Sequence, residues 1–180
     1  MSKTSNTVAI FVAVALTIGG YGTAAAMFNN LLTSWWIPSG YAFSLSVLSF
    51  VLMPGLFKIV TGSSNRWLNG VGHIAVMTGV FLCFITLINR VEIDSRPYIT
   101  VEAQIVRTYQ TTHYTTRRLR RNTYVKGSPY QMYHVEVLFP GGKEKNITVP
   151  RNTYTRLSRK HHVEVTLIRG WLGFEIIKGI

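Results

Sequence analysis

Residues 71–109 read VGHIAVMTGVFLCFITLINRVEIDSRPYITVEAQIVRTY, and the hydrophobic pattern of the chain changes within them. The first part, residues 71–89, is nearly continuous apolar sequence, about as long as a helix that crosses a bilayer. From Ile99 to Tyr109, β-branched residues partly alternate with polar ones, which is typical of a strand. We therefore predict a transmembrane domain over residues 1–90 and a soluble basic β domain over residues 91–180.

Charge follows the same division. Residues 1–90 hold four of the nineteen basic side chains and no Asp or Glu, whereas residues 91–180 hold the other fifteen and all seven acidic ones. The net charge of +12 thus divides into +4 and +8. With 14% charged residues, the chain is well below the roughly one quarter of ordinary soluble domains. This composition indicates an integral membrane protein.

Two further apolar stretches precede residues 71–89. They cover residues 7–28 and 41–61, and each is roughly 20 residues long, which matches a hydrocarbon core of about 30 Å. None of the three presents the charged face that a surface helix of a soluble protein would have. We therefore expect three transmembrane helices, with Pro54 bending the second.

The first stretch also resembles a secretory signal. Lys3 precedes an apolar run, and Ala24-Ala25-Ala26 is a suitable cleavage site. We expect a retained span, because the apolar sequence continues to Phe28.

The first stretch also contains small residues four positions apart, which let two helix backbones approach closely in lipid. We expect them to pack against the other two helices, with self-association as the alternative. These helix-packing residues are Gly20, Gly22, Ala24 and Ala26.

The orientation is predicted from basic residues near the spans. Residues 29–40, between the first two spans, carry no charge, whereas Lys58 and Arg66 lie near the turn between the second and third. An N-terminus in the cytoplasm keeps these two residues and Lys3 inside, and it places the β domain outside. We favour this orientation over the reverse. The reverse orientation would place the strongly basic β domain in the cytoplasm, where basic residues are common.

The C-terminal half predicts five short strands and one helical turn. Val135 and Val137 alternate with polar residues, and Pro140-Gly141-Gly142 is typical of a hairpin turn. Such a domain is expected to form a small barrel of the OB or SH3-like sort, or a curled sheet. The strands are expected at residues 99–109, 131–139, 144–149, 162–168 and 174–178, and the short helix at residues 150–158.

The run YHVEVLFPGGKEKNITVPRNTYTRLSRKHHVEVTLIRGWLGFEII, residues 133–177, resembles the β domains of small uncharacterised bacterial membrane proteins. In those proteins a strand precedes a glycine-containing turn, and a helical turn, a Val-rich strand and a G-[LWF]-[LF]-G-F ending follow. The resemblance covers about residues 99–178. It implies a bacterial membrane setting and no activity, and the Arg-rich insertion departs from the pattern.

That insertion, residues 108–130, reads TYQTTHYTTRRLRRNTYVKGSPY. We expect it to extend a hairpin or to form a loop that turns near residues 126–129. Its arginines could bind anionic lipid head groups, an acidic protein or, in a cytoplasmic domain, nucleic acid; the alternative is a solvated hairpin without a partner. We expect a lipid or protein partner rather than nucleic acid. The expected contact residues are Tyr114, Arg117, Arg118, Arg120, Arg121 and Tyr124.

Catalytic and metal-binding patterns are not found. A metal site needs three or four converging ligands, and each histidine of the β domain is better explained as solvated or hydrogen-bonded. The common catalytic motifs do not occur, and Cys83 is the one cysteine. We expect neither an enzyme nor a bound cofactor or metal. The histidines concerned are His113, His134, His161 and His162.

Two functional hypotheses follow. In the first, a three-helix anchor in the bacterial inner membrane presents the basic β domain, outside the cytoplasm, to a protein or lipid partner. Such a protein would be an accessory or assembly subunit or an immunity-type factor. In the second, the chain forms a homo-oligomeric channel or transport component through the small residues of its first span.

Overall fold

The computed structural model describes residues 3–120 and 123–180, with side chains from Thr7 onward. It confirms N-terminal helices followed by a five-stranded antiparallel sheet with one short helix. The chain divides into two compact units, here called the helical unit and the sheet unit. The helical unit consists of Met1–Pro97 and Arg169–Ile176, and the sheet unit of Tyr98–Ile168 and Ile177–Ile180.

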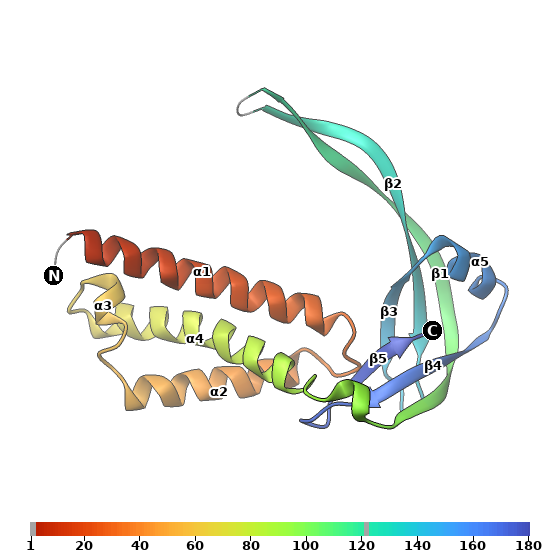
Figure 1. Cartoon of the computed structure of the whole chain (residues 1–180), viewed down its shortest axis with the longest axis horizontal. Helices are drawn as coiled ribbons and strands as arrows, with labels where there is room; N and C mark the ends of the chain where they lie inside the picture. Colours follow the sequence, from red (N-terminus) through yellow and green to blue (C-terminus); the bar gives the residue numbers. More distant parts are fainter. Residues whose placement is uncertain (1–2, 121–122) are drawn as a thin grey trace. The chain divides into compact units, whose positions relative to one another are not determined.

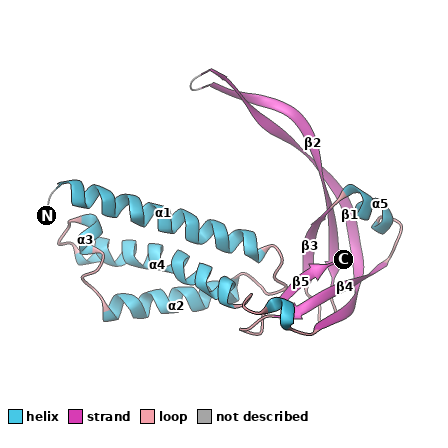
Figure 2. Ribbon diagram, viewed as in Figure 1, coloured by secondary structure: helices cyan, strands magenta, loops and turns pink. Residues whose placement is uncertain are grey.

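Three long helices and one short helix form most of the helical unit (Figures 1 and 2). Helix α4 lies between α1 and α2 and packs on both. Helices α1 and α4 are long and apolar enough to cross a membrane, whereas α2, with 17 residues, is shorter. The bounds are α1 Lys3–Phe28, α2 Trp36–Leu52, α3 Lys58–Thr61 and α4 Arg66–Ile88, and a short 3-10 turn, η1, follows at Ile93–Ser95.

The second helix has other bounds than the expected 41–61. It begins at Trp36, because Pro38 lies in the first turn, where a missing N–H costs no helical hydrogen bond. It ends at Leu52, because Pro54 disfavours the helical conformation at Met53, whose φ and ψ are −132° and 60°. Proline therefore ends this helix rather than bending it.

Helices α1 and α4 approach closely at two glycines. A Cβ on Gly20 would lie 2.7 Å from the backbone of Gly79, so the two backbones touch here. Ala24 is also fully buried against this side, in a cluster that includes Leu82 of α4. Gly22 has open space around it, and Ala26 is exposed. The four expected packing residues thus lie on two different sides of α1.

Helices α2 and α4 are joined by polar side chains. The hydroxyls of Ser46 and Thr78 lie 2.9 Å apart, and Ser49 Oγ lies 3.0 Å from Nε2 of His73. Ser46 and His73 are fully buried. In lipid, hydrogen bonds of this kind between helices add to van der Waals packing as a source of stability, because the hydrophobic effect does not drive helices together there.

The sheet unit contains an open sheet with the strand order β3-β2-β1-β4-β5. Strands β3 and β5 are its edges, so the closed barrel that we considered is wrong. One reason is that β1 and β2 pair mainly with each other over much of their length, rather than closing onto the outer strands. The strands are β1 Tyr98–Arg120, β2 Thr123–Leu138, β3 Glu144–Val149, β4 His162–Arg169 and β5 Glu175–Gly179, and helix α5 covers Arg151–Leu157.

One face of this sheet carries the core. Val135 of β2 and Val165 of β4 are fully buried, as the alternation of their strands predicts. Leu157 of α5 is buried with them, and the rings of Tyr133 and Tyr154 lie 5.0 Å apart. The helix α5 therefore packs on β2 and covers part of the apolar face.

Edge strand β3 directs one charged side chain toward the core face. Lys145 pairs with the buried Val137, and burial lowers the pKa of its ammonium group. An inward-pointing charge on an edge strand disfavours the addition of a further strand from another molecule. We therefore expect Lys145 to disfavour edge-to-edge pairing of this open sheet.

Candidate functional site

The outer part of the β1–β2 hairpin is a two-stranded ribbon, here called the arm. It comprises residues 111–120 and 123–132, which pair only with one another among the described residues. Figure 2 shows the two strands continuing beyond the other strands of the sheet unit. The arm includes most of the Arg-rich insertion. Of the two expected forms, an extended hairpin and a loop, the insertion therefore has the first.

The arm is cationic and exposed. Between Glu102 and Glu136 the chain contains no acidic residue. Apart from Thr111, Gly127 and Met132, the described side chains of the arm are exposed. Two-stranded hairpins are only marginally stable in water by themselves. The arm is thus a long solvated ribbon, and packing against the sheet does not explain why it is rich in basic and aromatic residues.

The expected turn at residues 126–129 is wrong, because these residues lie inside β2. Tyr114 pairs with Pro129 and Thr116 with Lys126, so two residues of β2 face Thr115 alone. Such an extra residue defines a β-bulge, where glycine is favoured. A Cβ on Gly127 would lie 2.9 Å from the carbonyl oxygen of Thr115 and would also overlap its hydroxyl. The Gly-Ser-Pro sequence thus forms a bulge.

One face of the arm brings basic and aromatic side chains together. Lys126 Nζ lies 3.4 Å above the ring centre of Tyr114. Arg118 pairs directly with Tyr124, whose side chain is 62% exposed, and paired residues of antiparallel strands project on the same side. Cations over the face of an aromatic ring interact favourably with its π electrons. This face therefore contains one cation–aromatic contact, between Lys126 and Tyr114, and one basic and one aromatic residue at paired positions, Arg118 and Tyr124.

The other arginines of the cluster are distributed differently. Arg117 pairs with Val125 and projects on the opposite face from its neighbour Arg118. Arg120 pairs with Thr123 beyond a further bulge, and its carbonyl accepts a hydrogen bond of 3.3 Å from Arg118 Nε. Arg121 lies outside the described residues. The consecutive arginines thus place positive charge on both faces of the ribbon.

A polar row runs from the sheet to the arm on the face opposite the core. The ion pair Arg107–Glu136 begins it, and Arg107 also lies 5.1 Å from the ring centre of Tyr109. Tyr109 stacks on His134 with a centroid distance of 4.9 Å, and its hydroxyl accepts a hydrogen bond from Asn146. The sequence did not predict this row, because its members come from three strands.

The histidines of this row are hydrogen-bonded. Thr111 Oγ1 lies 2.9 Å from Nε2 of His134 and 3.0 Å from Nε2 of His113. Thr148 Oγ1 lies 3.4 Å from Nδ1 of His134, and His113 stacks on Tyr130. Among the described residues no group of three or more His, Cys, Asp or Glu side chains could hold a metal ion. The row therefore has the bonding expected of a structural ladder.

An open polar hollow lies elsewhere on the sheet unit, with a volume of ≈ 520 Å³. His162 Nδ1 lies 3.5 Å from a carboxylate oxygen of Glu102 there, and both side chains are largely solvated. Glu102 and Glu164 face each other directly across β1 and β4. The described lining residues supply charge of both signs but no Ser, Thr or Cys nucleophile next to the histidine. They are Glu102, Arg156, Leu157, Lys160, His162, Val163, Glu164 and Ile180.

Comparison with known proteins gives no relative from which a function could be transferred. No protein-family model, curated protein or solved structure matches the chain. The arm is therefore the candidate site on its own physical features, namely its length, exposure, charge and aromatic content.

Proposed function

We propose that this chain is a membrane-anchored docking protein whose cationic arm binds an acidic protein. The observation that carries the proposal is the arm itself, an exposed ribbon without acidic side chains that holds Arg118 beside Tyr124 and Lys126 over Tyr114. Such a protein would act as an accessory or assembly subunit, or as an immunity-type factor, in a bacterial inner membrane.

The exposed apolar surface of the helices supports the membrane anchor. Only 17% of the apolar window of α1 and 28% of that of α4 is buried, whereas the core helix of a soluble protein would be mostly buried. Helix α2, at 17 residues, is at the lower limit for a span. Large exposed apolar side chains occur on all three helices, among them Phe11, Ile18, Phe43, Val51, Leu52 and Phe84.

The contact between Gly20 and Gly79 supports a retained first span. A signal sequence that is removed has no need of a close fit to another helix, whereas small residues at a helix crossing are typical of membrane bundles. The same contact weakens the alternative of an oligomeric channel. That hypothesis requires the small residues of α1 to meet another copy, but Gly20 and Ala24 are already covered by α4, which leaves Gly22 and Ala26 for such a contact.

The distribution of charge favours a protein over a flat lipid surface. Because Arg117 and Arg118 project on opposite faces, a planar bilayer would meet only part of the positive charge of the arm. An acidic protein can contact both faces of a ribbon, and guanidinium groups bind carboxylates in bidentate geometry. Exposed Tyr124 adds the amphipathic area that is enriched at protein interfaces.

Site-specific photo-crosslinking tests this function. A photoreactive amino acid at Tyr124, in the full chain and in native membranes, should give a discrete adduct with another protein. Replacing Arg117, Arg118, Arg120 and Arg121 by Ser should abolish the adduct. The matched control removes the same charge around α5, with Arg151, Arg156, Arg159 and Lys160 replaced by Ser, and it should leave the adduct unchanged.

Other results would contradict the proposal in recognisable ways. An adduct that nuclease removes would indicate nucleic acid. If no protein adduct forms, a bimane label at Tyr124→Cys, in a Cys83→Ala background, distinguishes lipid binding from no binding. A change in bimane emission when anionic lipid is added to the bilayer would identify the lipid as the partner, and an unchanged emission would leave a solvated arm.

A further inference from the structure

The turn between β4 and β5 belongs to the helical unit, although about 80 residues separate it from α4. Asn89, the residue that follows α4, is fully buried and bonds to this turn. Its Nδ2 donates to the carbonyl of Phe174 at 3.1 Å, and its Oδ1 accepts from the N–H groups of Leu172 and Phe174 at 3.1 and 3.3 Å. Its carbonyl accepts from Trp171 N–H at 3.1 Å.

Further contacts fix the same turn to the helices. Gly170 lies so close to Asn89 that an added Cβ would overlap the side chain and the carbonyl of Asn89. Leu32 N–H donates to the carbonyl of Glu175 at 2.9 Å, and Phe174 packs on the buried cluster of the three long helices. These hydrogen bonds and contacts hold the turn, residues 170–174, at the end of α4.

The tip of this turn is apolar and exposed. The side chain of Trp171 is 59% exposed, and Leu172 is exposed beside it in sequence. Trp36, 81% exposed, begins α2 at the same end of the helical unit, where Phe28 at the end of α1 contacts Trp35. Two large amphipathic rings thus project from the end at which α1 and α4 terminate.

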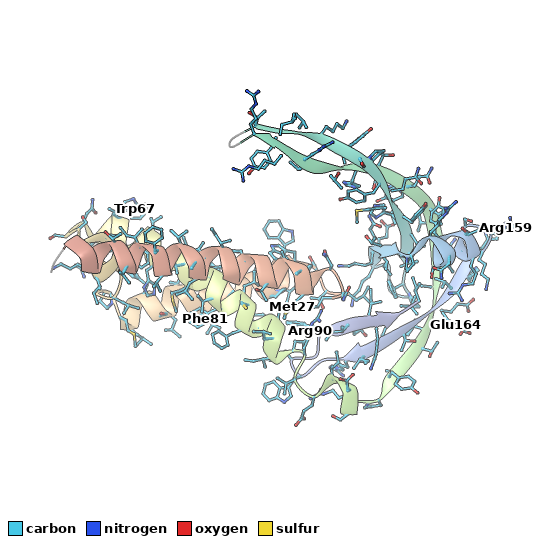
Figure 3. All side chains as sticks on the ribbon, turned by 45° about the horizontal axis from the view of Figure 1, so that its top comes forward. Met27, Trp67, Phe81, Arg90, Arg159 and Glu164 are labelled. Atoms are coloured by element: carbon cyan, nitrogen blue, oxygen red, sulfur yellow. The ribbon has the colours of Figure 1, made fainter. Side chains whose placement is uncertain are left out.

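The remaining tryptophan, Trp67, lies at the opposite end of the helical unit. Trp67 lies in the first turn of α4 and is 80% exposed. Figure 3 shows it at one end of the helices, with Arg90 and Met27 at the other. Helix α4 has 23 residues, which at 1.5 Å per residue gives roughly 34 Å, close to the hydrocarbon thickness of about 30 Å. Exposed tryptophans therefore lie at both levels where a membrane would meet water.

We propose that the 170–174 turn is a membrane-contacting element, and that Trp171 and Leu172 lie in the head-group region of the bilayer beside Trp36. Tryptophan prefers this region, because its ring is apolar while its N–H can bond to water or head groups. The occupant of this surface is lipid, because the turn is fixed at the end of a helix whose remaining surface is apolar and uncovered. The inference rests on the membrane anchor of the proposed function.

Fluorescence quenching tests the position of Trp171 in the full chain. A variant that keeps Trp171 as its one tryptophan, with Trp35, Trp36 and Trp67 replaced by Phe, is reconstituted into phosphatidylcholine vesicles. Lipids brominated near the head group should quench its emission more strongly than lipids brominated near the chain end. Acrylamide in the water should quench it weakly, and its emission should be blue-shifted.

Two matched variants serve as controls. A chain that keeps Trp67 alone reports the opposite interface and should show the same preference for shallow bromines. A chain without native tryptophans but with His161→Trp reports water, because His161 is exposed next to α5 in the sheet unit. Acrylamide should quench this control strongly, and bromolipids should not quench it.

The outcomes separate this inference from the proposed function. Quenching of Trp67 by lipid but of Trp171 only by acrylamide would overturn the inference and leave the anchor intact. Protection of Trp171 from both quenchers would also overturn it, because protein rather than lipid would then cover the turn. If the chain does not remain with the vesicles after carbonate washing, the proposed anchor itself fails.

Discussion

Asn89 carries most of the polar bonding between the end of α4 and the 170–174 turn. Its amide and carbonyl together make four hydrogen bonds to three residues of that turn. Each bond contributes about 1 kcal/mol net, but a buried group that loses its partner costs about 1–3 kcal/mol. A single buried amide can thus determine where a distant stretch of chain is held.

Replacing this side chain should destabilise the helical unit. We expect Asn89→Ala to lower the free energy of unfolding by on the order of 2–4 kcal/mol, because it leaves the N–H groups of Leu172 and Phe174 without their partner. It also removes one of the two hydrogen bonds to the carbonyl of Phe174, which still accepts from Gly170. Thermal unfolding of the full chain in detergent, followed by circular dichroism, measures the loss. Asn30→Ala removes an exposed amide between α1 and α2 and is the control. Equal stability of the two variants would contradict the role of Asn89.

The sequence predicts that a helix ends near Asn89, but not what the residue binds. An apolar run that stops at an Asn followed by an Arg indicates the end of a span. The partners of the amide lie more than 80 residues later, in a Gly-Trp-Leu-Gly segment that resembles any turn. Local sequence patterns do not indicate contacts between residues so far apart in the chain. The bonding of Asn89 to the 170–174 turn is therefore seen only in the structure.

Among the elements, the strands were predicted better than the turns and the limits of the helices. Alternating residues place β3, β4 and β5 close to their observed positions, because burial on one face leaves a period of two in the sequence. The expected second strand, residues 131–139, matches only the inner part of β2, which begins at Thr123. The Lys-Gly-Ser-Pro segment at residues 126–129 predicts a turn but forms a bulge, since both structures favour the same residues. The arm consequently extends further along the hairpin than the expected turn allowed.

The bulge in the arm provides a test at this scale. We expect Gly127→Val to disturb the pairing of the arm, because its side chain would collide with the backbone of Thr115. The arm pairs with no third strand, so the unfolding temperature of the whole chain should change little. Limited proteolysis should instead cleave the variant within residues 111–132 faster than the native chain. Ser128→Ala, at the neighbouring exposed position, is the control and should leave the rate unchanged.

For the whole molecule, composition and periodicity predicted the helical and β halves but did not decide between a closed barrel and an open, curled sheet. The sequence shows both the absence of acidic residues before position 91 and the change from continuous apolar stretches to alternating apolar residues after it. Closure of a small barrel depends on strand tilt and register, and neither leaves a local signal. The return of residues 169–176 to the helical unit was missed for the same reason.

Orientation is the prediction that belongs to the whole chain. Because Lys58 lies between α2 and α4, Arg66 begins α4, and the α1–α2 connection is uncharged, we expect the C-terminus outside the cytoplasm. Alkaline phosphatase fused after Ile180 should be active, and a fluorescent protein at the same position should be dark. Fusions after Asn65 should give the reverse pattern. The opposite result at both positions would place the arm in the cytoplasm and restore nucleic acid as a partner.

The return of residues 169–176 to the helices also sets an order of events during synthesis. The ribosome completes α4 about 80 residues before it releases this segment, which at roughly 5–20 residues per second is a delay of several seconds. Throughout that interval the buried amide of Asn89 has no Leu172 or Phe174 to bind. The nascent helices therefore keep one buried polar group without its hydrogen bonds until residues 171–174 have been synthesised.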